Sequence, residues 1–156
     1  MGLTTKTMLI RSSKPDDQPR LFEIWDAAVR ATHQFLAPRD LATIAQMVRD
    51  QYLPTAKNLA VVEDDHGQAF GFLGLNGSHI DSLFVHPERH SQGGGRALVE
   101  WAALSRTTLF VDVNEQNRGG RQFYERLGFV EVGRSSRDHD GRPYPLLHLR
   151  RTERIG

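Results

Sequence analysis

The sequence predicts a mixed α/β (α+β) fold, in which a mostly antiparallel, twisted sheet of about seven strands carries helices on both faces. Three observations lead to this prediction. A glycine-rich segment at residues 93–95 separates a strand from a helix and a further strand, which requires a parallel pair joined by a crossover. Asn76-Gly77 between two apolar runs is typical of a hairpin. The chain of 156 residues, without a plausible linker, is the length of one domain, residues 1–156.

The first third of the chain predicts an edge strand and two helices. Residues 8–11 form a short apolar strand. A cluster with Pro15 and Asp17 marks a helix start, and an apolar stripe at helical spacing carries that helix to about His33. A second helix follows Pro38. Its apolar face extends to Tyr52, and Pro54 is expected just beyond its end.

The remaining segments predict six strands and two helices. The expected strands are residues 59–63, 69–75, 80–85, 109–113, 129–134 and 144–150. One helix begins at the three glycines, and a short one spans residues 121–127 and ends at Gly128, a typical C-terminal cap. The early strands form an antiparallel meander, and the last two form a hairpin around residues 138–141.

Composition excludes several classes of protein. The chain has no cysteine, so disulfides, cysteine metal sites and a cysteine nucleophile are excluded. A net charge of +1 calls for no nucleic-acid partner. No apolar run of about 18 residues predicts a membrane span, and the N-terminus lacks the apolar core of a signal peptide, so we expect a cytoplasmic protein without a membrane partner. Either a monomer or a homodimer is compatible with these features.

The stretch IDSLFVHPERHSQGGGRALVEWAA, residues 80–103, organises the chain. Free backbone N–H groups and the positive end of the helix dipole meet at its glycines, which favours a pocket for phosphate or pyrophosphate. A P-loop is disfavoured because Arg96 and Ala97 follow the last glycine, and a dinucleotide fingerprint is disfavoured because Leu98 replaces its final glycine. A glycine-rich turn without a ligand is the alternative.

Two motifs resemble those of the GNAT acyl-CoA N-acetyltransferases. Residues 90–95, HSQGGG, are similar to motif A, Gln/Arg-x-x-Gly-x-Gly/Ala, with His90 at the position where Gln or Arg is usual. Residues 113–117, VNEQN, and 123–129, FYERLGF, resemble motif B, with Gly120 where alanine is usual. Together with Ala31-Thr32-His33 and a Pro-Tyr-Pro-Leu-Leu tail at residues 143–147, they resemble one bacterial branch of the family. The resemblance covers nearly the whole chain.

The resemblance implies the GNAT fold, acetyl-CoA as co-substrate, and transfer of its acetyl group to a primary amine on a small molecule or peptide. It implies that backbone groups around residues 92–96 hold the pyrophosphate, and that the strand at residues 83–85 lies beside the pantetheine arm. A backbone N–H near Phe84 or Val85 would polarise the thioester carbonyl. The residues expected to bind the cofactor are Leu83, Phe84, Val85, His90, Ser91, Gln92, Gly93, Gly94, Gly95, Arg96, Ala97, Asn117 and Phe123.

The resemblance also assigns candidate catalytic roles. Tyr124 matches the general acid that protonates the leaving thiolate, since a phenol pKa of about 10 is close to that of a thiol. His79 stands where many relatives carry a glutamate base, and an imidazole is suited to relay a proton near neutral pH. Asp81 would orient His79 or be the base itself. Thr32 and His33 are candidate acceptor contacts. Each of these residues also has a purely structural interpretation, as a packing tyrosine, a hairpin-end histidine or a helix-end histidine.

Other chemistries find less support. His86 and His90 flank Pro87, which breaks the helix that a zinc site at this spacing requires, so no metal is expected. No Ser-His-Asp set stands out, so direct transfer in a ternary complex is preferred to an acyl-serine intermediate. The alternatives to an enzyme are a GNAT-fold acyl-CoA sensor and an unrelated nucleotide-binding protein.

Overall fold

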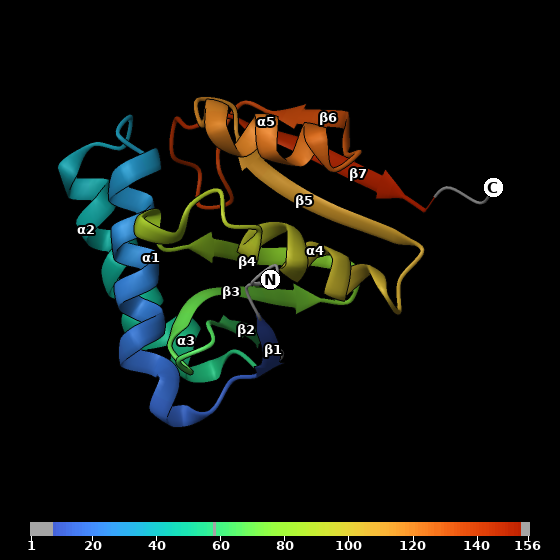
Figure 1. Ribbon diagram of the computed structural model, residues 1–156. Helices are drawn as coiled ribbons and strands as arrows, with labels where there is room; N and C mark the ends of the chain where they lie inside the picture. Colours follow the sequence, from blue (N-terminus) through green and yellow to red (C-terminus); the bar gives the residue numbers. More distant parts are fainter. Residues whose placement is uncertain (1–7, 58, 154–156) are drawn as a thin grey trace.

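The computed structural model describes residues 8–57 and 59–153. Residues 1–7, at the N-terminus where the sequence analysis found no signal-peptide core, lie outside the described part. One sheet runs through the described chain, in the order β1-β2-β3-β4-β5-β7-β6 (Figure 1). Its strands are β1 (Leu9–Ser12), β2 (Leu59–Glu63), β3 (Ala69–Asn76), β4 (His79–Val85), β5 (Thr108–Asn114), β6 (Val130–Ser135) and β7 (Leu146–Thr152). Among the strands of the described residues only β4 and β5 pair in parallel, so the predicted mixed, mostly antiparallel sheet with its crossover is confirmed.

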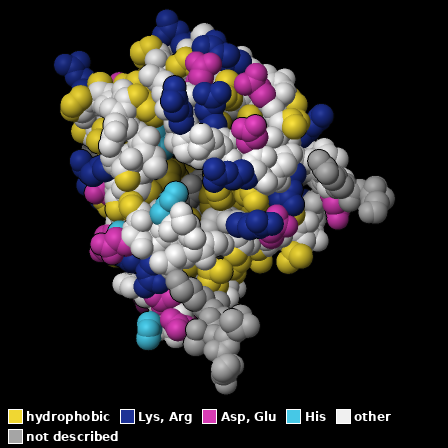
Figure 2. Space-filling model, turned by 45° about the horizontal axis from the view of Figure 1, so that its top comes forward, with side chains coloured by type: hydrophobic (Ala, Val, Ile, Leu, Met, Phe, Trp, Pro, Cys, Tyr) yellow, Lys and Arg dark blue, Asp and Glu magenta, His cyan; other side chains and the backbone are white. Residues whose placement is uncertain are grey.

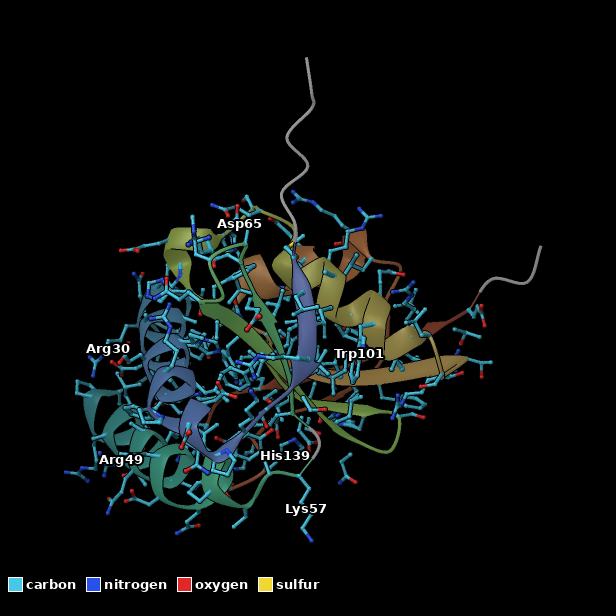
Figure 3. The ribbon with its side chains drawn as sticks, turned by 60° about the horizontal axis from the view of Figure 1, so that its bottom comes forward. Arg30, Arg49, Lys57, Asp65, Trp101 and His139 are labelled. Atoms are coloured by element: carbon cyan, nitrogen blue, oxygen red, sulfur yellow. The ribbon has the colours of Figure 1, made fainter. Side chains whose placement is uncertain are left out.

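Helices cover both faces of this sheet, as Figures 1 and 3 show. The α-helices are α1 (Gln18–Thr32), α2 (Pro38–Met47), α3 (Leu53–Thr55), α4 (Gly94–Ala103) and α5 (Arg118–Arg126). A π-helical turn, Val48–Tyr52, joins α2 to α3, and short 3₁₀ turns, Pro15–Asp17 and Pro87–Arg89, precede α1 and follow β4. The helices α1 to α3 lie on one face, and α4 and α5 lie on the other.

Strand alternation divides the core into two layers. Ala60, Val62 and Leu73 point to the α4 and α5 side, where they pack with Leu98 and Val99 of α4. The intervening positions of the same strands point the other way. There Val61 and Phe72 are fully buried against Leu21, Ile24 and Trp25, the apolar stripe of α1. The face that carries α1 therefore has its core over β2 to β4, and this core does not extend over β5 to β7.

Three boundaries differ from the sequence expectations. The helical backbone does not end before Pro54: it continues from α2 through the π-helical turn into α3, where Pro54 sits in the first turn and its missing N–H is not needed. The last helix begins at Arg118 rather than Arg121, since Asn117 caps it. The final strand begins at Leu146, and Tyr144 belongs to the preceding turn, where its N–H donates to the carbonyl of Arg142.

Among residues 8–57 and 59–153, no helix is both long enough and apolar enough to span a bilayer.

Candidate active site

The strands β4 and β5 separate after two residue pairs. Their parallel pairing covers only His79 with Phe110 and Ile80 with Val111. Beyond these pairs β4 contains a bulge, since Gly74 pairs with Ser82 and Leu75 with Ile80, which leaves Asp81 as the extra residue. The rest of β4 therefore keeps its hydrogen bonds to β3 but has no partner strand on the β5 side among the described residues.

Backbone alternation decides which N–H groups of β4 face this gap. The N–H of His86 donates to the carbonyl of Phe70 at 2.8 Å, toward β3. Because successive N–H groups of a strand point to opposite sides, Phe84 also points toward β3, whereas Leu83 and Val85 point toward β5. Of the two donors expected from the sequence, Val85 rather than Phe84 faces the gap.

The glycine-rich loop turns sharply into α4. Ser91 (φ 67°) and Gly93 (φ 89°) are both in the left-handed region, and α4 begins directly after them. The first intrahelical bond runs from Ala97 N–H to Gly93 O at 2.9 Å. The N–H groups of Gly94, Gly95 and Arg96 have no acceptor among the described residues, and Arg96 is exposed beside them.

Two of the three glycines are also packing residues. A Cβ on Gly94 would lie 2.5 Å from the ring of Phe70, and a Cβ on Gly95 would lie 3.1 Å from the ring of Phe123. Gly94 and Gly95 are buried, whereas Gly93 is exposed. The glycines thus let α4 approach the sheet and α5 closely, in addition to leaving the loop N–H groups accessible.

Tyr124 is packed into the core of the α4 and α5 layer. Its ring meets those of Phe123 and Phe129 edge-on, with centroids 5.1 and 5.2 Å apart, and only 7% of the residue is exposed. Burial raises the pKa of Tyr124 well above its ordinary value of 10.0, so the expectation of a pKa near that of a thiol is not met. Burial is the cause of this shift, and no hydrogen bond contributes to it. The hydroxyl stays protonated at neutral pH.

Asn117 caps α5, as its structural interpretation requires. Its Oδ1 accepts the N–H of Gly120 at 3.0 Å. A Cβ on residue 120 would lie only 2.6 Å from Nδ2 of Asn117, so glycine at this position leaves room for the side chain to fold over the first turn. The cap places Asn117 at the end of α5 that follows β5, next to the gap between β4 and β5.

The candidate bases meet a carboxylate that the sequence analysis did not single out. Despite the bulge, His79 Nδ1 lies 3.5 Å from Asp81 Oδ1. On its other side, His79 Nε2 lies 3.4 Å from Oδ2 of Asp112 on β5. Asp112 also contacts two further histidines. Its Oδ1 lies 2.6 Å from Nδ1 of His148 on β7, and its Oδ2 lies 3.0 Å from Nε2 of His139 in the β6–β7 connection. One carboxylate thus joins three imidazoles.

Electrostatics keep this carboxylate ionised. Asp112 is only 15% exposed, and burial by itself raises the pKa of its carboxyl. The hydrogen bond from His148 and the nearby imidazoles of His79 and His139 outweigh this, so the pKa of Asp112 lies below its ordinary value of 3.8. Within the described residues no group of three or more His, Asp or Glu side chains has a geometry suited to a metal ion.

A Ser-His-Asp set that did not stand out in the sequence is present in the structure. Ser135 Oγ lies 2.6 Å from His148 Nε2, and His148 Nδ1 lies 2.6 Å from Asp112 Oδ1. The set cannot be recognised in the sequence because Ser135, His148 and Asp112 belong to three different strands, β6, β7 and β5. These strands are neighbours only in the folded sheet.

Thr32 and His33 lie at the end of α1, facing the end of β5. The Thr32 hydroxyl donates to Ala28 O at 2.8 Å and is 2.7 Å from His33 Nδ1, so Nδ1 carries the proton and donates to the hydroxyl. Burial lowers the pKa of His33 to about 4, and a hydrogen bond with Asn114 opposes this shift only in part. His33 is therefore neutral at pH 7 and suited to hydrogen bonding rather than to proton relay.

An unpredicted contact ties the α1–α2 connection to the final hairpin. Tyr144 Oη accepts the N–H of Ala37 at 3.0 Å and donates to Asp40 at 2.5 Å. Its ring also faces Phe35, with centroids 5.9 Å apart. The segment after α1 and the segment before β7 thereby form one continuous wall beside His33.

A cavity of about 650 Å³ lies elsewhere, at the C-terminal ends of α4 and α5. Leu109 and Leu127 line it together with Arg106, Arg126 and Arg151. Figure 2 shows basic side chains around a hollow with a hydrophobic floor on the face that carries these helices. Because α4 begins at Gly94, this cavity is at the opposite end of the helix from the glycine loop and is not part of the candidate active site.

Comparisons with known proteins agree with this geometry. Residues 55–131 match the model of the acetyltransferase (GNAT) domain. The chain is 41% identical over 140 residues to the peptidyl-lysine N-acetyltransferase YjaB of Salmonella typhimurium, covering 90% of this chain and 95% of that protein. It is 28% identical over 122 residues to the peptidyl-lysine N-acetyltransferase YiaC of Escherichia coli, covering 78% of this chain and 82% of that protein.

Solved structures show the same fold. The solution structure of apo YjaB from Escherichia coli matches with a TM-score of 0.88 and 38% identity, covering 95% of this chain and 99% of that one. The PaiA N-acetyltransferase of Thermoplasma acidophilum, in complex with coenzyme A, shares the fold at 14% identity, with a TM-score of 0.73, covering 94% of this chain and 99% of that one. The expected resemblance to a bacterial branch with YjaB is confirmed.

Proposed function

This chain belongs to the GNAT family and is an acyl-CoA-dependent acetyltransferase, and from that premise we propose that it acetylates the ε-amino group of lysine in a peptide or protein, by direct transfer from acetyl-CoA. The observation that carries the proposal is the gap between β4 and β5, with the His79–Asp112 pair beside it. YjaB and YiaC, both named peptidyl-lysine N-acetyltransferases, support lysine as the acceptor.

The glycine loop is proposed to hold the pyrophosphate of coenzyme A. Its unpaired N–H groups at Gly94, Gly95 and Arg96, next to the left-handed Ser91 and Gly93, fit an anion. Arg96 adds a side-chain contact, and His90 takes the place where the family usually has Gln or Arg. Phe123, packed against Gly95, and Asn117 border the same space. Acetyl-CoA supplies the activated thioester.

The free edge of β4 is proposed to bind the pantetheine arm as an added strand. The N–H and C=O groups of Leu83 and Val85 face the gap and are available for this pairing. Val85 N–H is proposed as the donor that polarises the thioester carbonyl, because a fixed dipole stabilises the charge that develops on that oxygen. The side chain of Phe84 remains core.

His79 is proposed to take the proton of the acceptor amine, directly or through water. An alkylammonium has a pKa of about 10.4, so the proton must leave before or during attack. Asp112 and Asp81 contact the two ring nitrogens of His79 and stabilise the imidazolium that forms. The same two carboxylates attract a cationic lysine side chain to this face.

Tyr124 is proposed to protonate the leaving thiolate. Its high pKa keeps the hydroxyl protonated, and no hydrogen bond contributes to that pKa. Thr32 and His33, with the wall formed by Phe35 and Tyr144, are proposed to border the acceptor. The alternative is a sensor that binds acyl-CoA without turnover.

A peptide with a single lysine tests the proposal. The full chain is mixed with acetyl-CoA and either this peptide or the same peptide with arginine in place of lysine, and thiol release and peptide mass are followed. We expect thiol release and one added acetyl group with the lysine peptide only. Binding of acetyl-CoA by calorimetry without any lysine-dependent thiol release would favour the sensor, and binding of ATP in its place would contradict both.

A further inference from the structure

Three adjacent strands bring together a serine, a histidine and an aspartate on one face of the sheet. Asp112 of β5 pairs directly with His148 of β7, and Ser135 lies on β6, the next strand. The aspartate binds Nδ1 of the histidine and the serine binds Nε2, each at 2.6 Å. Since a carboxylate can only accept, Nδ1 carries a proton, and a ring with no second proton offers its Nε2 lone pair to the serine hydroxyl. This is the connectivity of an activated nucleophile.

An irregularity in β6 makes the contact between His148 and Ser135 possible. The register of β6 against β7 shifts between Glu131 and Gly133, and Gly133 then pairs with His148. A Cβ on Gly133 would lie 3.3 Å from Cδ2 of the imidazole and 3.7 Å from its Cβ. Glycine at this position therefore gives the imidazole room to lie over β6 and reach Ser135.

We propose that Ser135, His148 and Asp112 form a second acyl-transfer centre, in which Ser135 accepts an acyl group from a small activated ester or thioester and passes it to water. The Oγ–acyl bond forms as the bond from the acyl carbon to the leaving oxygen or sulfur breaks. The serine proton moves to His148 Nε2 and then to the leaving group. Water, deprotonated by the same nitrogen, releases the carboxylic acid and restores the serine.

The surroundings of Ser135 suit a small, exposed acyl group. Ser135 and His148 are half-buried, so a substrate reaches the hydroxyl from solvent. The N–H groups of Ser136 and Arg137, which follow Ser135, have no backbone acceptor among the described residues. The centre lies on the opposite side of the sheet from Tyr124 and α4 and shares only Asp112 with the proposed base His79, and it goes beyond the lysine acetylation proposed above.

The neighbouring serine provides a matched control. The full chain is incubated with p-nitrophenyl acetate, nitrophenolate release is followed, and the acetylated residue is located by peptide mass spectrometry. We compare wild type, Ser135→Ala, Ser136→Ala and Gly133→Ala. We expect hydrolysis to fall at least ~100-fold in Ser135→Ala and to persist in Ser136→Ala. In Gly133→Ala, where the imidazole is displaced, we expect a smaller fall.

A second readout separates this centre from amine acetylation. Ser135→Ala should still acetylate the lysine peptide, whereas Tyr124→Phe should lose that activity and keep ester hydrolysis. Wild-type hydrolysis by Ser135→Ala, or an acetyl group found only on lysines or on Ser136, would overturn the proposal. The contact would then be a cross-strand hydrogen bond without chemistry. Failure of lysine acetylation in wild type, with Ser135-dependent hydrolysis intact, would overturn the proposed function alone.

Discussion

Nε2 of His79 on β4 lies 3.4 Å from Oδ2 of Asp112, which directly follows the last β5 residue paired with β4. The contact places a candidate base and an ionised carboxylate at the point where the sheet opens. Asp81, the extra residue of the β4 bulge, lies on the other side of the ring, with its Oδ1 3.5 Å from Nδ1 of His79. The base hypothesis can therefore be tested at both of its carboxylate partners.

Replacing His79 by alanine should reduce lysine acetylation by ~10²–10⁴-fold, because proton transfer by a positioned base contributes about that factor. The rise of activity with pH on the acid side should disappear as well. Asp112→Asn removes the anion that favours the imidazolium, so we expect the acid limb of the rate profile to move to lower pH, with a smaller effect from Asp81→Asn. The measurement is turnover of the lysine peptide across the acid range.

Asp65→Asn is the matched control for the two aspartates, since Asp65 is exposed in the β2–β3 turn, far from this cluster (Figure 3). Its profile should equal that of wild type. A His79→Ala protein that keeps both its rate and its acid limb would return His79 to a structural role at the hairpin and leave the base to another group or to bulk water.

Replacing Tyr124 by phenylalanine should lower turnover by ~10²–10⁴-fold while acetyl-CoA binding is nearly unchanged. The ring is held between Phe123 and Phe129, and the substitution preserves these contacts. Because no hydrogen bond to the hydroxyl contributes to the pKa of Tyr124, its loss should cost little stability. Calorimetric titration measures the binding of acetyl-CoA, and thermal unfolding measures the stability of the variant. Turnover within a few-fold of wild type would assign Tyr124 to packing.

Much of the fold followed from local patterns. The Asn76-Gly77 turn, the glycines at the start of α4 and the apolar stripe of α1 each depend on a few neighbouring residues. The strand spans were correct to within two residues at each end. The end of the second helix was missed because Pro54 reads locally as a helix breaker. The structure shows instead that the helical backbone continues through the π-helical turn Val48–Tyr52 and past Pro54 to Thr55.

The candidate site was predictable only where a motif marks it. His79 and Asp81 are neighbours in sequence, but Asp112 and His148 are 36 residues apart and meet only through the pairing of β5 with β7. Tyr144 and Asp40 are 104 residues apart. No periodicity or spacing in one sequence reports such contacts, because they depend on strand order and register.

Arg96→Glu should weaken binding of coenzyme A by about tenfold or more, which is at least ~1.4 kcal/mol. The substitution places a carboxylate next to the N–H groups of α4, where the pyrophosphate is proposed to bind, and Arg96 is exposed, so folding should be unaffected. Substituting Gly95 is a poorer test, since a Cβ there would press on Phe123 at 3.1 Å and disturb packing.

Lys57→Glu is the charge-matched control, because Lys57 is exposed between α3 and β2, away from α4 (Figure 3). Its affinity for coenzyme A, measured by titration calorimetry at moderate salt, should stay within about twofold of wild type. Equal affinities of the two variants for coenzyme A would contradict a contact between Arg96 and the cofactor. They would also contradict the proposed pyrophosphate site at this end of α4.

Protonation of His33 should couple stability to pH. An unfolded histidine titrates near pH 6.5, whereas burial lowers the pKa of His33 in the folded protein to about 4. Between these values the unfolded state binds more protons, so the free energy of unfolding falls as the pH is lowered through this window and is unaffected by His33 above it. The loss should be on the order of 1–2 kcal/mol near pH 5.

Urea unfolding between about pH 4 and 7 tests this coupling. We expect the free energy of unfolding of His33→Asn to depend less steeply on pH than that of wild type. The control His66→Asn, which replaces a histidine whose side chain is 86% exposed, should retain the wild-type slope. Identical slopes for all three proteins would show that His33 titrates alike in both states and that the end of α1 is open to water.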